Sequence, residues 1–276
     1  MNPLHSVVDI DAYCRRIGYG GTRSPTLATL RAIQEAHVRS IAFENLDSLG
    51  GEVVAIDLQS VQRKLVSGGR GGYCFEQNTL LGAVLEGLGF RVSALAARVR
   101  WQVPSDVVTA LGHMALRVSL GDASYLVDAG FGSMSLTAPL EFGVPGLQAT
   151  SLEPCRLNPV GGGYLLEVQL GEAWHALYQF DLSDHPPPDF EVFNWYTCTS
   201  PQSTFVTSLM AASIDGRRRH TLLNNRHTVR APGCEPLVRQ LCSVAELEGV
   251  LEETMGIRVP RSTALHSKFE MLVALR

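Results

Sequence analysis

The sequence predicts an α+β fold in which helices come first, an antiparallel sheet or barrel follows, and strands and helices mix at the end. In the first third of the 276 residues, apolar residues recur at helical spacing. After Gly89 the apolar period changes to two, which is typical of strands. Strand-like stretches and two helices then complete the chain.

Three helices are predicted before this change of period. The first begins at Ser6 and Asp9 and stops at Gly18. The second begins at Asp57, and the third begins at about Cys74 and ends where the strand pattern starts. Their apolar faces are Ile10, Tyr13, Cys14 and Ile17; Leu58, Val61 and Leu65; and Leu81, Val84, Leu85 and Leu88.

Alternating apolar and polar residues joined by short turns predict hairpins in the middle third. One hairpin turns at Gly121-Asp122 and another at Gly171-Glu172. A run of hairpins of this kind suggests a small antiparallel sheet or barrel. The predicted strands are Arg91–Trp101, Met114–Leu120, Tyr125–Asp128, Tyr164–Leu170 and Ala173–Phe180.

The last third mixes both kinds of element. Pro186-Pro187-Pro188 is the best linker candidate, because a proline run is stiff and cannot join a sheet interior. Strand-like patterns then cover Phe205–Ile214 and Arg219–Leu223. One terminal helix begins with the capping box Ser243-Val244-Ala245-Glu246, and the other covers Leu265 to Leu275.

Composition and charge exclude several classes of protein. Lys and Arg number 23 against 27 Asp and Glu, and this formal charge of −4 argues against nucleic-acid binding. The longest uncharged run, Phe193–Ile214, has too many polar residues for a membrane span. Asp9 and Asp11 lie where a signal peptide would need an apolar core. Six scattered cysteines without a CxxC pattern then indicate reduced thiols in the cytoplasm.

The stretch Arg70–Asn78 (RGGYCFEQN) carries the strongest signal for chemistry. Cys74 stands at a predicted helix N-terminus, where unpaired N–H groups and the helix dipole favour a thiolate. The glycines before it let the backbone approach a ligand closely. Taken alone, the stretch fits equally well a glycine cap and a turn with Cys74 as a small buried residue.

A thiolate nucleophile needs a base, and the base needs a group that orients it. His113 opens an alternating strand, on the face opposite Met114 and Leu116. Asp128 ends the next strand of the same hairpin and can fold back beside His113. A carboxylate there would set the imidazole tautomer and stabilise the imidazolium. A cysteine at a helix start followed by His and Asp on adjacent strands is more specific than any one of the three.

With these motifs the chain resembles the arylamine N-acetyltransferases over nearly its whole length. The resemblance implies a helical bundle over residues 1–89 that carries the nucleophile, an antiparallel β-barrel over 90–188 that carries His and Asp, and an α/β lid over 189–276. The Cys-His-Asp core would be similar to that of cysteine proteases. The motifs are Ile41–Leu46 (IAFENL), Arg70–Asn78, His113, Val127–Gly132 (VDAGFG), and Asn194–Tyr196 followed by Ser200-Pro201 and Phe205.

The resemblance also implies the reaction, which is acetyl transfer from acetyl-CoA through an acetyl-cysteine to an arylamine, hydrazine or arylhydroxylamine, as in xenobiotic metabolism. Cys74 would be the nucleophile, His113 the base and Asp128 its orienter. Acetyl-CoA is then a co-substrate, and no metal is implied. The implied pocket for the aromatic acceptor consists of Phe43, Val99, Phe131 and Phe205, and the implied contacts with CoA are Thr109, Gly112 and Gly132.

Two other functions stay open on the sequence alone. A transglutaminase-like amidase or protease would also use Cys, His and Asp in this order. A non-catalytic relative could keep the fold and bind CoA or an aromatic ligand without the chemistry. Acceptor-dependent release of CoA separates the first from acetyl transfer, and an unreactive Cys74 would identify the second.

Several weaker motifs are assigned structural roles. Gly130-Phe131-Gly132 lacks the third glycine of a dinucleotide fingerprint. Arg217–His220 is expected to be the solvated tip of a hairpin, and Glu44 and Arg70 are expected to form a structural ion pair beneath the site. Two histidines and two cysteines could be drawn as a zinc site, namely His220, His227, Cys234 and Cys242. Their spacings match none of the common zinc patterns, so no metal is expected.

Overall fold

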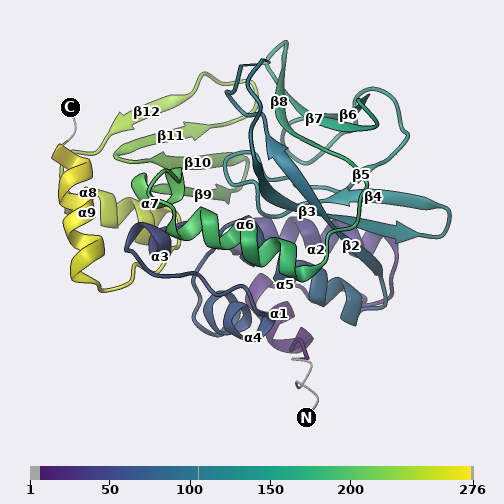
Figure 1. The fold of residues 1–276 in the computed structure, drawn as a ribbon, viewed down its shortest axis with the longest axis horizontal. Coiled ribbons are helices and arrows are strands. Elements are labelled where there is room, and N and C mark those ends of the chain that lie inside the picture. The colour runs from purple at the N-terminus through teal and green to yellow at the C-terminus, as the bar shows by residue number, and fades with distance from the viewer. Residues whose placement is uncertain (1–6, 105, 275–276) are drawn as a thin grey trace.

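The computed structural model of the chain describes residues 7–104 and 106–274. In this part of the chain, a seven-stranded antiparallel sheet and a five-stranded antiparallel sheet lie side by side (Figure 1). The helices of the first third lie below the larger sheet in this view, and two C-terminal helices flank the smaller one. The predicted α+β architecture is confirmed.

From residue 7 onward, the first third consists of helices and one short strand. Two predicted helix starts are confirmed, because the side chains of Asp9 and Asp57 accept the N–H groups of Ala12 and Ser60. Ser6 lies outside the described residues. The elements are α1 (Ile10–Ile17), α2 (Leu27–Ser40), β1 (Phe43–Glu44), α3 (Leu46–Leu49), α4 (Leu58–Val61), the π-helical η1 (Gln62–Ser67) and α5 (Cys74–Gly87).

Helix α5 is the centre of the first hydrophobic core. Its residues Leu80, Leu81, Val84 and Leu85 have no exposed surface. A helix that is apolar on most of its faces must be surrounded by other elements, and each such side chain contributes about 1.5–3 kcal/mol when it is buried. This burial anchors α5, and with it the residue at its N-terminus, Cys74.

The middle third forms the predicted hairpins, in the spatial order β5-β4-β3-β2-β8-β7-β6. Strand β3 separates two cores, since Met114 and Leu116 pack with α5 while Ala115 faces the barrel interior. The strands are β2 (Arg91–Val99), β3 (Leu111–Leu120), β4 (Ala123–Val127), β5 (Leu140–Glu141), β6 (Cys155–Val160), β7 (Gly163–Leu170) and β8 (Ala173–Phe180).

One glutamine brings the two edge strands of this sheet together. The side chain of Gln148 bonds the backbone N–H and carbonyl of Glu141 in β5 at 2.8 and 2.9 Å. Its own backbone pairs with Cys155 in β6. The sheet therefore curls into a nearly closed barrel, as the hairpin pattern predicted.

The last third contains the second sheet, in the order β1-β9-β10-β11-β12. Strand β1 joins it through the pairs Phe43↔Ala212 and Glu44↔Ala211, so a segment of the first third completes this sheet. No helix within the described residues is long and apolar enough to cross a membrane. The elements are α6 (Pro187–Thr199), α7 (Thr204–Thr207), β9 (Met210–Asp215), β10 (Arg218–Leu223), β11 (Arg226–Arg230), β12 (Leu237–Gln240), α8 (Val244–Gly249), the π-helical η2 (Val250–Thr254) and α9 (Thr263–Ala274).

Three expectations for this region are wrong. Pro186–Pro188 is no linker, because Pro187 and Pro188 begin α6, where a proline loses no helical hydrogen bond. Phe205 lies on the short helix α7, and strand β9 begins only at Met210. Arg219 and His220 are not a solvated tip, since both are buried and Arg219 forms an ion pair with Glu153 at 2.8 Å.

Candidate active site

Cys74 is the first residue of α5 and is 2% exposed. The preceding residue, Tyr73, has extended backbone and caps the helix, so the helical turn starts at the cysteine itself. The Cys74 Sγ lies 3.9 Å from the carbonyl oxygen of Gly112, at the start of β3. The predicted position of the thiol at a helix N-terminus is confirmed.

His113 and Asp128 meet beside this thiol. His113 lies near the start of β3, and Asp128 is the first residue after the neighbouring strand β4. The His113 Nε2 lies 2.8 Å from the Asp128 Oδ2, and both side chains are buried. Nε2 is occupied by the carboxylate, so Nδ1 is the ring nitrogen left for the hydrogen bond with Cys74.

The environment favours a charged imidazole. Burial by itself lowers the pKa of His113, but the Asp128 carboxylate and the Cys74 side chain together raise it to about 10. Burial raises the pKa of Asp128, and His113 with the surrounding donors brings it below its usual value. At neutral pH the site therefore holds an imidazolium between a carboxylate and the sulfur of Cys74.

Asn78 fixes the Asp128 carboxylate, and the sequence analysis did not single it out. Its Nδ2 donates to the Asp128 Oδ1 at 2.9 Å and to the carbonyl of Met114 at 2.7 Å, while its Oδ1 accepts the Ala129 N–H at 3.0 Å. Asn78 thereby joins α5 to β3 and to the end of β4. Its spacing, one helical turn after Cys74, was the available signal.

Glycines in the RGGYCFEQN and VDAGFG motifs allow backbone segments around Cys74 to approach one another closely. A Cβ added to Gly130 would lie 2.5 Å from the Cα of Cys74, and one added to Gly72 would lie 2.6 Å from Glu76 Oε2. At Gly71 an added Cβ would overlap the carbonyl oxygen of Ala42. The backbone contacts at Gly71 and Gly130 require glycine, so internal packing accounts for these two positions, and the approach of a ligand to the glycines before Cys74 stays a prediction.

Two of the predicted pocket residues lie together. The rings of Phe43 and Phe205 are 6.3 Å apart in an edge arrangement, although they come from β1 and α7. Tyr73 lies beside Phe205 at 5.3 Å. Gly132 has a φ of +80° and leaves room for the Phe43 ring, which an added Cβ would approach to 3.1 Å. The two phenylalanines thus lie next to the end of the VDAGFG motif.

A second aromatic group surrounds the imidazole. Phe131 meets His113 edge-on at 5.3 Å between ring centroids, and Tyr178 lies 4.7 Å from His113 on the barrel side. Tyr178 is fully buried, and burial followed by the charge of Asp128 raises the pKa of its phenol well above the usual value. The sequence analysis missed Tyr178, because nothing near it in the chain indicates the site.

The remaining predicted residues lie on β2 and the loop after it. Val99 pairs with Tyr178 in the β2–β8 ladder. The Thr109 hydroxyl donates to the Val99 carbonyl at 2.9 Å, and the Gly112 carbonyl is the neighbour of the Cys74 sulfur. Their contacts with acetyl-CoA or an acceptor stay predictions. Within the described residues, no group of three or more His, Cys, Asp or Glu could hold a metal ion.

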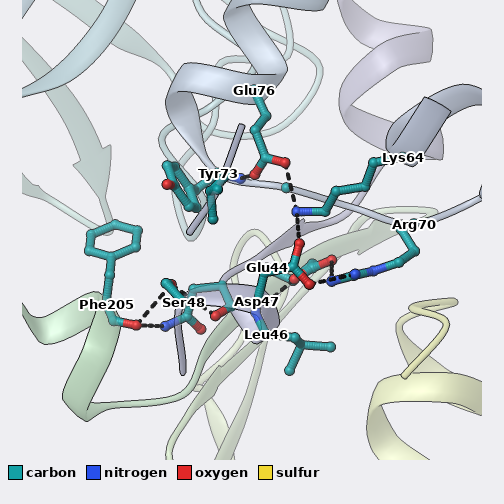
Figure 2. A network of polar contacts seen from close by, with 12 residues as sticks. Glu44, Leu46, Asp47, Ser48, Lys64, Arg70, Tyr73, Glu76 and Phe205 are labelled. Atoms are coloured by element: carbon teal, nitrogen blue, oxygen red, sulfur yellow. Dashed lines mark hydrogen bonds and ion pairs between the residues drawn. The ribbon is translucent and has the colours of Figure 1, made fainter. Parts of the chain in front are cut away.

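The predicted ion pair beneath the site is confirmed. Arg70 Nη2 lies 2.8 Å from Glu44 Oε1, and Arg70 Nη1 lies 2.5 Å from Asp47 Oδ1 (Figure 2). The Glu44 side chain has no exposed surface and also accepts the Leu46 N–H at 2.8 Å. These contacts hold β1 and the loop before Cys74 together.

Comparisons with known proteins agree with this geometry. The model of the N-acetyltransferase family matches residues 26–264. The arylamine N-acetyltransferase of Mycolicibacterium smegmatis is 40% identical over 254 residues, which cover 91% of this chain and 92% of that protein. The Escherichia coli K12 enzyme of the same name is 34% identical over 251 residues, 91% of this chain and 89% of its own.

Solved structures give the same result for the fold. The arylamine N-acetyltransferase of Mycobacterium marinum superimposes with a TM-score of 0.92 at 38% identity, over 96% of this chain and all of that one. A structure of the M. marinum enzyme in complex with CoA matches with the same TM-score and identity, over 99% of that chain. The chain described here belongs to the arylamine N-acetyltransferase family.

Proposed function

We propose that the chain transfers an acetyl group from acetyl-CoA to aromatic amines through an acetyl-cysteine at Cys74. One observation carries the proposal: Asp128, His113 and Cys74 form a buried line, in which the Asp128 carboxylate lies 2.8 Å from His113 Nε2 and raises the pKa of the imidazole beside the sulfur. A base in this position can take the proton of the Cys74 thiol and so generate the nucleophile. The complex of the M. marinum relative with CoA supports acetyl-CoA as the donor.

In the first half-reaction, the Cys74 thiolate attacks the thioester carbonyl of acetyl-CoA. The carbon–sulfur bond to CoA breaks, and the departing thiolate takes the proton from the His113 imidazolium. One thioester replaces another, so the step has little free-energy cost. Asp128 keeps the proton of His113 on Nε2, so that Nδ1 remains the nitrogen that exchanges protons with the reacting groups.

In the second half-reaction, the acceptor nitrogen attacks the acetyl-cysteine carbonyl. The neutral imidazole of His113 takes a proton from the amine, the carbon–sulfur bond breaks, and an amide is released. The Cys74 thiolate and the imidazolium are thereby restored. Since the first product leaves before the acceptor reacts, initial-rate plots against both substrates give parallel lines.

The acceptor pocket is proposed to comprise Phe43, Val99, Phe131 and Phe205. The edge contact of Phe43 with Phe205 supports an aromatic acceptor, because flat rings gain from stacking and from area burial. We include arylhydroxylamines, since a Salmonella typhimurium relative is named N-hydroxyarylamine O-acetyltransferase as well. Hydrazines as acceptors stay a prediction from the resemblance. Aniline-type acceptors should then react faster than alkyl amines of equal basicity, and equal rates would remove the pocket from the proposal.

The proposal extends to three further points. Thr109, Gly112 and Gly132 are expected to approach CoA at the entrance to the site. Residues 1–89, 90–188 and 189–276 are proposed as bundle, barrel and lid. The scattered cysteines favour the cytoplasm as the compartment.

The test is to incubate the protein with acetyl-CoA and no acceptor, and then to map acetylation by peptide mass spectrometry. We expect one acetyl group, on Cys74, that is discharged when an arylamine is added. Cys74→Ser should show none, whereas Cys242→Ser, a change at an exposed cysteine, should behave as the parent does. Continued release of CoA beyond one equivalent without an acceptor would favour a hydrolase such as an amidase, and the absence of any acetyl group on Cys74 would favour a binding protein.

A further inference from the structure

Five charged side chains gather around the segment from Arg70 to Glu76, which contains Cys74, and the proposed reaction uses none of them (Figure 2). Each comes from a different segment around the start of α5. Three are acidic and two are basic, which gives the group a net charge of −1. They are Glu44 in β1, Asp47 in α3, Lys64 in η1, Arg70 in the loop before Cys74, and Glu76 in α5.

Lys64 connects this group to the nucleophile's helix. Its Nζ lies 2.6 Å from Glu76 Oε1 and 2.8 Å from Asp47 Oδ2. Arg70 contacts Glu44 and Asp47, so within the described residues Lys64 is the cation that pairs with Glu76. The π-helical winding of η1 brings Lys64 here, and such segments frequently occur at functional sites.

Glu76 caps the turn of α5 that begins with Cys74. Its Oε2 accepts the backbone N–H of Tyr73 at 3.1 Å, so its two oxygens bind one helix-terminal donor and one ammonium group. The side chain has no exposed surface. Gly72 leaves the space that this carboxylate fills, since an added Cβ would lie 2.6 Å from Oε2. The position of Glu76 is therefore coupled to that of the first turn.

The charge of Glu76 matters because it lies in the same helical turn as the sulfur. Burial raises the pKa of Glu76 to about 7, and Lys64 acts against this rise. For Lys64, burial lowers the pKa, but the carboxylates of Glu76, Glu44 and Asp47 raise it above its usual value. An unbalanced carboxylate here would oppose a thiolate at Cys74, and the ammonium cancels that effect.

We propose that Lys64 is a positioning residue for Cys74: it holds the Glu76 carboxylate as the cap of α5 and balances its negative charge beside the thiolate. The inference rests on the proposed function, because it requires Cys74 to be the nucleophile. Lys64 acts through Glu76 and contacts no reacting atom.

The test compares Lys64→Met with the matched control Arg63→Met, whose guanidinium lies on the exposed side of η1 and donates to Ser60 Oγ. Single-turnover acetylation of Cys74 and its alkylation by iodoacetamide are measured from pH 5 to pH 9. Lys64→Met makes the group more negative wherever Glu76 is ionised, so in that pH range the acid limb of both profiles should move up by about one pH unit. At a fixed pH on the acid limb, a shift of one unit lowers the rates of acetylation and alkylation about tenfold. Arg63→Met and Lys64→Arg should follow the parent.

Glu76→Gln should move the acid limb the other way, to lower pH, because it removes a negative charge and keeps an acceptor for the Tyr73 N–H. The double variant Lys64→Met/Glu76→Gln restores the net charge and should return toward the parental profile. A purely structural role for the pair predicts no such opposite shifts.

Profiles of Lys64→Met and Glu76→Gln that coincide with that of Arg63→Met would overturn the inference, as would shifts in the same direction. Where Lys64→Met does not fold, the downward shift of Glu76→Gln decides alone, and an unchanged limb there overturns the inference. Failure of the proposed function looks different, since the parent itself would then carry no acetyl group on Cys74.

Discussion

Replacing Gly130 by alanine should slow acetylation of Cys74 strongly, although Gly130 contributes no functional group. The new Cβ would lie 2.5 Å from the Cα of Cys74, 3.0 Å from its Cβ and 2.8 Å from the Nδ2 of Asn78. Ordinary contact for a Cβ begins at 3.4 Å, so the two segments must separate by about 1 Å. The obstacle is the backbone of the buried helix α5, which cannot rotate away as a flexible side chain can.

The size of the effect follows from this displacement. Overpacking a close-packed site costs about 1–3 kcal/mol of unfolding free energy, and for a chain of this size each kcal/mol lowers Tm by about 2–4 °C. A misplacement of 1 Å can lower the rate by about 10²-fold. Because Asn78 Nδ2 is also displaced, its 2.9 Å bond to Asp128 weakens as well. The loss of rate should therefore exceed what the loss of stability explains.

Gly249→Ala is the matched control, because nothing lies within 4 Å of its added Cβ and its φ is not positive. Glycine to alanine at this position, the last residue of α8, should leave activity unchanged and raise the free energy of unfolding by about 0.4–1 kcal/mol. The assay is single-turnover acetylation of Cys74 at a temperature where both variants are folded, together with Tm. A Gly130→Ala protein with the parental rate and Tm would refute the packing argument.

Two further predictions concern charge. In Asp128→Asn, the side-chain oxygen must still accept from Asn78 and the Gly130 N–H, so the new NH₂ group faces His113 Nε2 and forces the wrong imidazole tautomer. We expect kcat to fall by up to about 10⁴-fold, with Tm within a few degrees of the parent. Near-parental turnover would exclude Asp128 from the mechanism. Burial lowers the pKa of His37 from 6.5 to about 4, so this neutral imidazole stabilises the fold fully above pH 6.5 and progressively less as the pH falls towards 4. Urea unfolding should show that about 2 kcal/mol of unfolding free energy is lost from this source between pH 7 and pH 5. His37→Gln should lack that part of the loss.

Sequence periodicity predicted the helices and strands whose buried residues are apolar and follow one another at regular spacing. Helix α5 and the hairpins of the barrel were predicted because their patterns are uninterrupted. Helix α2 was missed, because the buried face of Leu27–Ser40 includes Gln34 and His37. These polar side chains are satisfied by distant partners: Gln34 donates to the Leu136 carbonyl, and His37 bonds Gln77 at 2.7 Å. The hydrophobicity of the local segment does not indicate hydrogen-bond partners that are distant in the sequence.

The same limit explains the wrong interpretation of Arg219. Three consecutive arginines after Asp215-Gly216 are typical of a solvated turn. Arg218, the middle residue of the run, is exposed at the start of β10, but Arg219 is buried, and Glu153 and the Ser135 carbonyl accept its hydrogen bonds. A buried charge becomes acceptable only through such a partner, and this one is 66 residues away in the chain.

The candidate site shows why its reactive residues were easier to predict than the residues that hold them. Cys74, His113 and Asp128 are residue types with few other reasons to occur in that order, so their chemistry made them candidates, and the family resemblance supplied the role expected of each. Gly130 and Asn78 have meaning only through the distances between α5, β3 and the end of β4, which no local pattern encodes. If these contacts set the geometry, conservative changes at such residues should reduce the rate by more than their effect on stability explains, and Gly130→Ala is the sharpest case, because it deletes no chemical group.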